Sequence, residues 1–129
     1  MTKRELINIC LELPEVYEDY PFEFLTDTPD SWALIRHKGN KKSLASVTVH
    51  KGRLMINLKC NPFEADMLRQ TFRDITPEYH MNKDHWNSVY PDGDVPAEML
   101  RGLIKNSYEL TKPKSKRSIN PSAGVPGRI

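Results

Sequence analysis

The side chains best suited to catalysis or ligand binding fall in one run, residues 79–87, which reads Tyr-His-Met-Asn-Lys-Asp-His-Trp-Asn. Its two aromatic rings could stack on a base or pack against a sugar, and Lys83 could contact a phosphate. His80 and His85 could act as acid and base, but the run itself contains no serine or cysteine nucleophile. No third ligand completes a metal site around them, so we do not expect a metal there. A structural role, with Trp86 anchoring the core and Lys83 in a salt bridge, fits the same residues.

A second group of candidates is basic. Residues 36–63 hold seven bases and no acid, whereas residues 1–35 hold two bases against eight acids. Residues 64–111 carry five bases against nine acids, and residues 112–129 carry five bases and no acid. The net charge of +2 therefore hides a basic middle and a basic tail, an asymmetry that favours an anionic partner.

A β-hairpin is expected to position the middle bases, because two alternating runs flank Lys51-Gly52 as a two-residue turn. Pairing outward from His50 and Arg53 puts an apolar set on one face: Ala45, Val47, Val49, Leu54, Ile56 and Leu58. The other face receives Ser46, Thr48, His50, Arg53, Asn57 and Lys59, together with Met55 and Leu44. A slip of one residue would mix the two faces, so the register is well specified.

Cations on such a face could follow a phosphate backbone. Side chains on one face of a strand lie about 6.5–7 Å apart, which is close to the phosphate spacing along DNA. A preceding strand at residues 32–38 adds Arg36 and Lys38 to the set. The alternative is a solvated outer face whose lysines discourage edge-to-edge pairing.

The remaining pattern predicts three helices and further short strands. Helices are expected at residues 3–13, behind a capping box of Thr2 and Glu5, at 61–72 with Asn61 as cap, and at 96–110. Strands are expected at 21–25, 79–81 and 85–89, with residues 15–20 as an acidic connection. Without βαβ alternation, we predict an α+β fold: one two-layer domain over residues 1–111, with a mostly antiparallel sheet and the helices packed on one side. Residues 112–129 are predicted to be a disordered basic tail.

The sequence also carries signals about location. No apolar run approaches the ~20 residues of a membrane span, and the start lacks the apolar centre of a signal peptide. We therefore expect a cytoplasmic protein with no membrane contact. Cys10 and Cys60 have no CxxC spacing and are expected to be reduced, partly buried thiols.

Four blocks resemble a known family. They are Leu13-Pro14 with Pro21-Phe22, then Leu58-Lys59-Cys60-Asn61-Pro62, then residues 77–89, and finally Ser107-Tyr108-Glu109-Leu110. In this order, across residues 1–110, the chain resembles the MmcQ/YjbR family of small bacterial α+β proteins. The resemblance implies a fold akin to the CyaY-like and secretion-chaperone-like architectures, and DNA binding through a "double wing" of strands, with no established catalytic activity or cofactor. The motif residues it implies are Lys59, His80, Asn82, Lys83, His85 and Trp86.

These observations lead to one principal hypothesis and two alternatives. The principal hypothesis is a non-enzymatic protein that binds DNA with low sequence specificity through Arg36, Lys38, Lys51, Arg53, Lys59, His80, Asn82, Lys83, His85 and Trp86. The first alternative is a chaperone-like protein-interaction module, whose partner would be a second copy of the chain or another protein. The second is small-ligand binding or catalysis at His80, His85 and Trp86, which is favoured if those side chains line a concave pocket.

Overall fold

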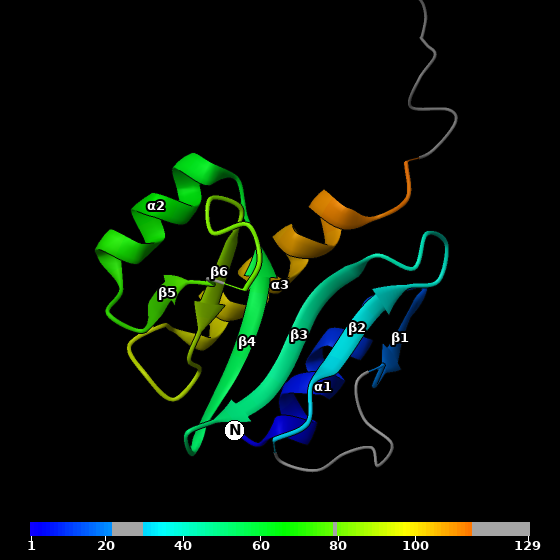
Figure 1. Cartoon of the computed structure of the whole chain (residues 1–129), viewed down its shortest axis with the longest axis horizontal. Helices are drawn as coiled ribbons and strands as arrows, with labels where there is room; N and C mark the ends of the chain where they lie inside the picture. Colours follow the sequence, from blue (N-terminus) through cyan, green and yellow to red (C-terminus); the bar gives the residue numbers. More distant parts are fainter. Residues whose placement is uncertain (22–29, 79, 115–129) are drawn as a thin grey trace, which may run out of the picture.

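The computed structural model describes residues 1–21, 30–78 and 80–114, and its centre is a six-stranded sheet (Figure 1). The strands are β1 (Val16–Asp19), β2 (Ala33–His37), β3 (Ser43–His50), β4 (Arg53–Lys59), β5 (Ile75–Pro77) and β6 (Trp86–Val89). They lie in the order β1-β2-β3-β4-β6-β5, and every neighbouring pair is antiparallel. The helices are α1 (Lys3–Leu11), α2 (Pro62–Thr71) and α3 (Ala97–Thr111). The predicted α+β class is confirmed.

The first two helices begin where their capping residues require. At α1 the Glu5 N–H donates to Thr2 Oγ1 at 3.1 Å, and the Thr2 N–H donates to Glu5 Oε1 at 2.7 Å. At α2 the side chain of Asn61 accepts from the Phe63 N–H at 3.0 Å, and Pro62 occupies the first helical position. Each cap satisfies backbone donors that the first turn leaves without a partner, so both predicted helix starts are confirmed.

The hairpin of β3 and β4 has the predicted register, from the His50–Arg53 pair to the Ala45–Leu58 pair. Lys51 and Gly52 form its turn with φ values of 50° and 78°. Two successive positive φ values give a type I′ turn, whose twist matches that of the strands it joins. Lys51 therefore adopts a left-handed conformation that favours glycine, and this turn keeps the two strands in register.

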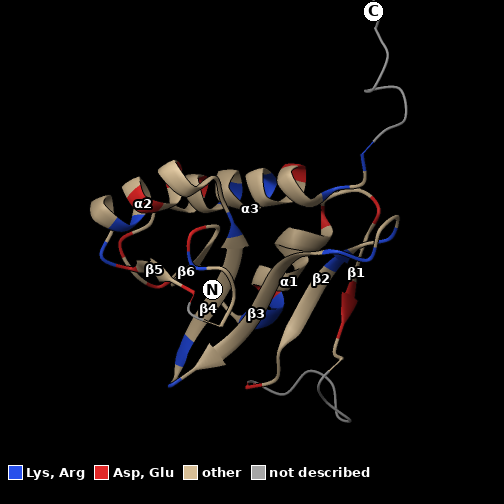
Figure 2. Ribbon diagram, turned by 45° about the horizontal axis from the view of Figure 1, so that its top comes forward, with Lys and Arg blue, Asp and Glu red and all other residues tan. Residues whose placement is uncertain are grey.

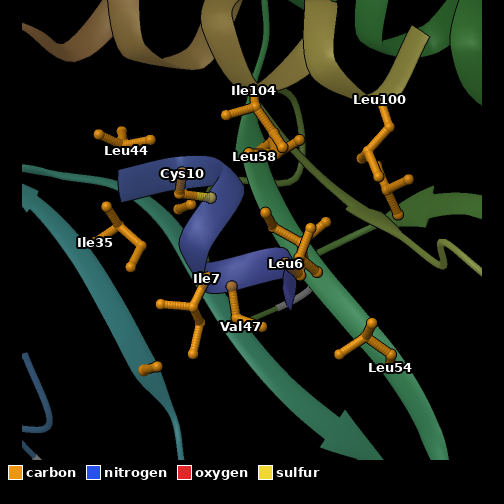
Figure 3. Packing of buried hydrophobic residues seen from close by; sticks show 14 of the residues in the cluster. Leu6, Ile7, Cys10, Ile35, Leu44, Val47, Leu54, Leu58, Leu100 and Ile104 are labelled. Carbon is orange, nitrogen blue, oxygen red and sulfur yellow. The ribbon is translucent and has the colours of Figure 1, made fainter. Parts of the chain in front are cut away.

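The helices cover one face of the sheet. Leu6 and Ile7 of α1 and Leu100 and Ile104 of α3 pack onto alternate residues of β2, β3 and β4, such as Val47 (Figure 3). The third helix, α2, contacts β5 and β6 at one end of the sheet. The opposite face carries no helix from the described part of the chain (Figure 2). Functional side chains on that face are therefore positioned by strands and loops.

Leu44 lies in the core, where it is fully buried, and not on the outer face as predicted. The pairing of β2 with β3 shifts register between Ile35 and Arg36, and the pairing of β3 with β4 stops at Ala45. At this irregularity Leu44 and Ala45 both have zero exposure. Strict alternation, on which the prediction depended, does not hold across such an irregularity.

Two predictions about the elements are wrong, and two more fall partly outside the described residues. Residues 15–20 are not only a connection, because β1 pairs with β2 from Val16–His37 to Asp19–Leu34. The partner of β6 is β5, at residues 75–77, in place of the predicted strand at 79–81. The predicted strand at 21–25 and the predicted disordered tail lie largely in residues 22–29 and 115–129, which are not described. Of the described helices, none combines the length and apolar character needed to cross a membrane.

Candidate functional site

The helix-free face of the sheet is not uniformly solvated. Its central polar residues are buried: Ser46 is 8%, Thr48 2% and Asn57 2% exposed. The sequence predicts these residues on the outer face, and their register confirms that they share it. Their burial shows that neighbouring side chains cover the centre of this face, so it differs from an ordinary outer surface.

Hydrogen bonds tie these buried groups across three strands. Asn57 Nδ2 donates to Ser46 Oγ at 3.1 Å, and Ser88 Oγ donates to Asn57 Oδ1 at 2.6 Å. The Ser88 hydroxyl also lies 3.3 Å from Glu78 Oε2. Buried polar groups are costly unless they are hydrogen-bonded, and this network meets that requirement while fixing the side chains in place.

Above this network lies a cleft of about 480 Å³. We call it the sheet-face cleft, and its lining residues are Trp32, Leu34, Ser43, Ser46, Asn57, Glu78, His80, Met81 and Trp86. Its volume falls in the range of about 300–1,000 Å³ that is typical of small-molecule sites. Two tryptophans, a leucine and a methionine supply apolar surface, and a few polar groups share the same space.

Glu78 and His80 form the charged side of the cleft. Glu78 Oε1 accepts from the backbone N–H of His80 at 2.8 Å and from His80 Nδ1 at 3.0 Å. The Glu78 side chain is 6% exposed, whereas that of His80 is 93% exposed. A buried carboxylate therefore holds an exposed imidazole, and the Nε2 atom of that ring faces away from the pair.

Several of the predicted nucleic-acid contacts are instead ion-paired within the chain. Arg53 Nη2 lies 2.6 Å from Asp92 Oδ1 and 3.1 Å from Asp74 Oδ1, and its guanidinium stacks on the ring of Tyr90 at 4.4 Å. The pKa of Asp92 is lowered by the hydrogen bond from Arg53. Arg36 Nε contacts Asp19 Oδ2 at 2.8 Å, and Lys38 Nζ lies 3.9 Å from Glu15 Oε2.

The other predicted contacts are spread over the molecule. Lys51 is at the tip of the hairpin, and Lys59 is at the far end of β4, about 20 Å from Arg53 at the usual rise per residue. Lys83 is exposed on the loop before β6. Within the described chain these three lysines form no ion pair. Arg53 and Lys59 share the outer face of the hairpin with Asn57, but the structure does not gather the predicted cations into one cluster.

The motif run, residues 79–87, divides into two parts. His80 and Trp86 line the sheet-face cleft, whereas His85 and Asn82 shape the loop between them. The His85 N–H donates to the Asn82 carbonyl at 2.9 Å, and the Asn82 side chain accepts from the Asp84 N–H at 3.0 Å. Tyr79 lies outside the described residues.

A different set of cations does come together, at one end of the molecule. The turn after β2 carries Lys38, Lys41 and Lys42, and the chain leaves α3 through Lys112 and Lys114; we call these five lysines the basic end. Asn40 Nδ2 donates to the Thr111 carbonyl at 3.0 Å, which ties the turn to the end of α3. Figure 2 shows the basic segments there in blue.

Sequence reasoning did not bring together the other residues that line the cleft: Trp32, Leu34, Ser43, Ser46, Asn57, Glu78 and Met81. One signal was available. The predicted outer face of the hairpin has uncharged Ser46, Thr48 and Asn57 at its centre, whereas a fully solvated face favours charged side chains. Glu78 gave no such signal, because its place depends on how β5 pairs with β6. No group of three metal-ligating side chains occurs in the described ranges.

Comparison with known proteins gives consistent matches. The model of the YjbR family matches residues 11–110. The chain is 43% identical over 104 residues to uncharacterised protein YbdF of Escherichia coli O157:H7, covering 79% of this chain and 77% of that one. It is 30% identical over 122 residues to uncharacterised protein YjbR of E. coli K12, covering 92% and 97%. A crystal structure of a Deinococcus radiodurans protein with a DUF419 domain superposes with a TM-score of 0.73 at 29% identity, covering 98% and 93%.

Proposed function

The chain belongs to the YjbR family, and we propose that it is a non-enzymatic binding protein that holds a small, largely apolar molecule in the sheet-face cleft. The observation that carries this proposal is the cleft itself. It joins a hydrogen-bonded polar floor to apolar walls in a volume of about 480 Å³. Small-molecule sites have this composition, because apolar walls supply affinity and a few fixed polar groups supply orientation.

Binding is favoured over catalysis by the way the polar groups are paired. A nucleophilic serine needs a base within hydrogen-bond reach. In the described part of the chain the Ser46 and Ser88 hydroxyls bond to Asn57, and neither bonds to His80. The only hydrogen bonds of the imidazole there go to Glu78. The cleft therefore lacks a nucleophile and base held together.

A fragment screen by protein-observed NMR tests this proposal. Aromatic fragments at millimolar concentration should shift signals of Trp32, Trp86 and Met81. The substitution Met81→Glu puts a charge on an apolar wall and should weaken those shifts. Met67→Glu is the matched control, because Met67 is exposed on α2, outside the cleft. Fragments that bind both variants and the unaltered protein equally, or that shift signals elsewhere, would overturn the proposal.

DNA binding is a second candidate, and the basic end favours it. Five lysines meet there, and Glu15 and Glu109 are the acids paired with them in the described chain. Such a patch suits a phosphate backbone, which is bound by clustered charge without sequence readout. This candidate places the contacts at Lys41 and Lys42, and not on the hairpin.

Fluorescence anisotropy with duplex DNA distinguishes the basic end from the hairpin as the DNA-binding surface. The double variant Lys41→Glu, Lys42→Glu should weaken binding strongly, and Lys51→Glu, at the hairpin tip, should weaken it little. With about five phosphate contacts, log affinity should fall against log salt with a slope of about −4 to −5. An absence of binding at low salt would exclude DNA as the partner. Equal effects of the two variants would exclude the basic end as its site.

A further inference from the structure

Among the described residues that line the sheet-face cleft, Glu78 is the one acid, and none is a lysine or an arginine. Glu78 is 5% exposed, and within the described chain no lysine or arginine pairs with it. Its carboxylate receives two hydrogen bonds from His80 on one oxygen, while the other oxygen lies 3.3 Å from the Ser88 hydroxyl, whose single hydrogen is donated to Asn57. A carboxylate has about four acceptor sites, so Glu78 keeps the capacity to accept from a ligand.

His80 adds a second acceptor. Since Nδ1 bonds to a carboxylate oxygen, which only accepts, Nδ1 carries the hydrogen. In the tautomer that this hydrogen bond selects, Nε2 is an acceptor, and His80 is one of the residues that line the cleft. An anionic ligand group would therefore meet a carboxylate and a lone pair in place of donors.

Asn57 provides one donor at the floor. Its Nδ2 atom carries two hydrogens, and only one, donated to Ser46 Oγ, has a partner within the described residues. Asn57 is 2% exposed and lines the cleft. Ser88 Oγ lies 2.6 Å from Asn57 Oδ1 and 3.3 Å from Glu78 Oε2, so the floor donor lies close to the wall acceptors.

We infer that the ligand of the sheet-face cleft is a flat aromatic molecule bearing a neutral N–H donor group, such as a carboxamide, and not a carboxylate or phosphate. This inference rests on the proposed function. Trp32, Trp86 and Met81 provide surfaces for a ring. The carboxamide N–H groups match Glu78 and His80, and its carbonyl oxygen matches the free N–H of Asn57.

An isosteric pair of probes tests the inference in the unaltered protein. Indoleacetamide and indoleacetate have the same ring and nearly the same shape, but the first ends in an N–H donor and the second in an anion. Indole, the bare ring, is the third probe. Dissociation constants are measured by NMR titration of the full chain. We expect indoleacetamide to bind about ten- to hundredfold more tightly than indoleacetate, because the Glu78 carboxylate accepts a hydrogen bond from the amide and repels the anion. The affinity of indole should lie between the two.

The substitution Glu78→Gln tests the assigned residue. It keeps an oxygen for His80 but removes the charge, so it should strengthen indoleacetate binding and weaken indoleacetamide binding. The ratio of the indoleacetate dissociation constant to that of indoleacetamide should therefore fall by about tenfold. Glu98→Gln, an exposed acid on α3, is the matched control and should leave the ratio unchanged. His80→Ala, at an exposed position, gives a second variant if Glu78→Gln fails to fold, and it should also reduce the preference for the amide.

The outcomes separate the inference from the proposal on which it rests. If all three probes bind in the cleft with equal affinity, the binding function stands and the ligand class is wrong. If indoleacetate binds most tightly, the ligand class is also wrong. If none of the probes binds at millimolar concentration, both the proposed function and the inference fail.

Discussion

Ser88 donates a 2.6 Å hydrogen bond to Asn57 across the β4–β6 pair, on the face of the sheet that carries no helix. The two residues are register partners, and both are almost fully buried. A buried polar pair on an open sheet face is expensive unless each side chain has a hydrogen-bond partner. This pair forms the rigid floor on which the proposed binding site depends.

Removing the Asn57 amide should destabilise the fold. Asn57→Ala leaves the hydroxyls of Ser46 and Ser88 without their partner, and the cost of such buried groups is about 1–3 kcal/mol. Urea unfolding measures the change. Asn106→Ala on α3 is the control, where a partly exposed helical position should change stability by less than about 0.5 kcal/mol. An equal effect of the two variants would contradict the role of the network.

The Arg53–Asp92 ion pair should make stability depend on acid pH. Because Arg53 lowers the pKa of Asp92 in the folded state, the contribution is fully present above the ordinary aspartate pKa of about 3.9. It is lost as the pH falls through the lower folded value. Asp92→Asn should therefore flatten the fall in unfolding free energy below about pH 4. A slope identical to that of the unaltered protein would contradict the prediction.

His37 should contribute a second pH dependence, in a higher range. Burial lowers the pKa of His37, whose Nε2 lies 2.8 Å from Thr111 Oγ1, while Glu109 opposes the shift and Lys112 reinforces it. The folded state thus favours the neutral ring. Its stabilisation is complete above the unfolded pKa of about 6.5 and declines as the pH falls below it. NMR titration of the ring should give a midpoint below about 6.5, and a midpoint above that value would contradict the account.

The thiol of Cys10 should be inert in the folded protein. Burial raises its pKa to about 12, and the side chain has no exposed surface. A thiol reagent at neutral pH should therefore modify Cys10 only after unfolding, since the reactive form is the thiolate. Cys60→Ala isolates Cys10 for the measurement. Labelling at the same rate with and without urea would show that the core around α1 is open.

Periodicity and capping residues predicted the elements whose own sequence decides their structure. The β3–β4 register follows from two alternating runs, and α1 and α2 begin at Thr2 and Asn61 as their side chains require. The strand β1 was missed because its acidic residues favour solvent. Glu18 and Asp19 are accommodated by Arg4 and Arg36, which come from other elements.

The site was less predictable, because its parts are distant in sequence. Charge counts suggested a basic face but could not show that Arg53 pairs with Asp74 and Asp92. The motif run supplied His80 and Trp86, and the topology added Glu78 and Asn57. Which polar groups share one cleft is set by the order of the strands, and no local pattern specifies that order.

The most direct test of the binding site is a search for intermolecular nuclear Overhauser effects between indoleacetamide and the protein. The account predicts contacts from the ligand ring to the Met81 methyl group and the Trp86 indole, and from its amide hydrogens to the region of Glu78 and His80. Contacts only to other surfaces, or none at millimolar ligand, would contradict it.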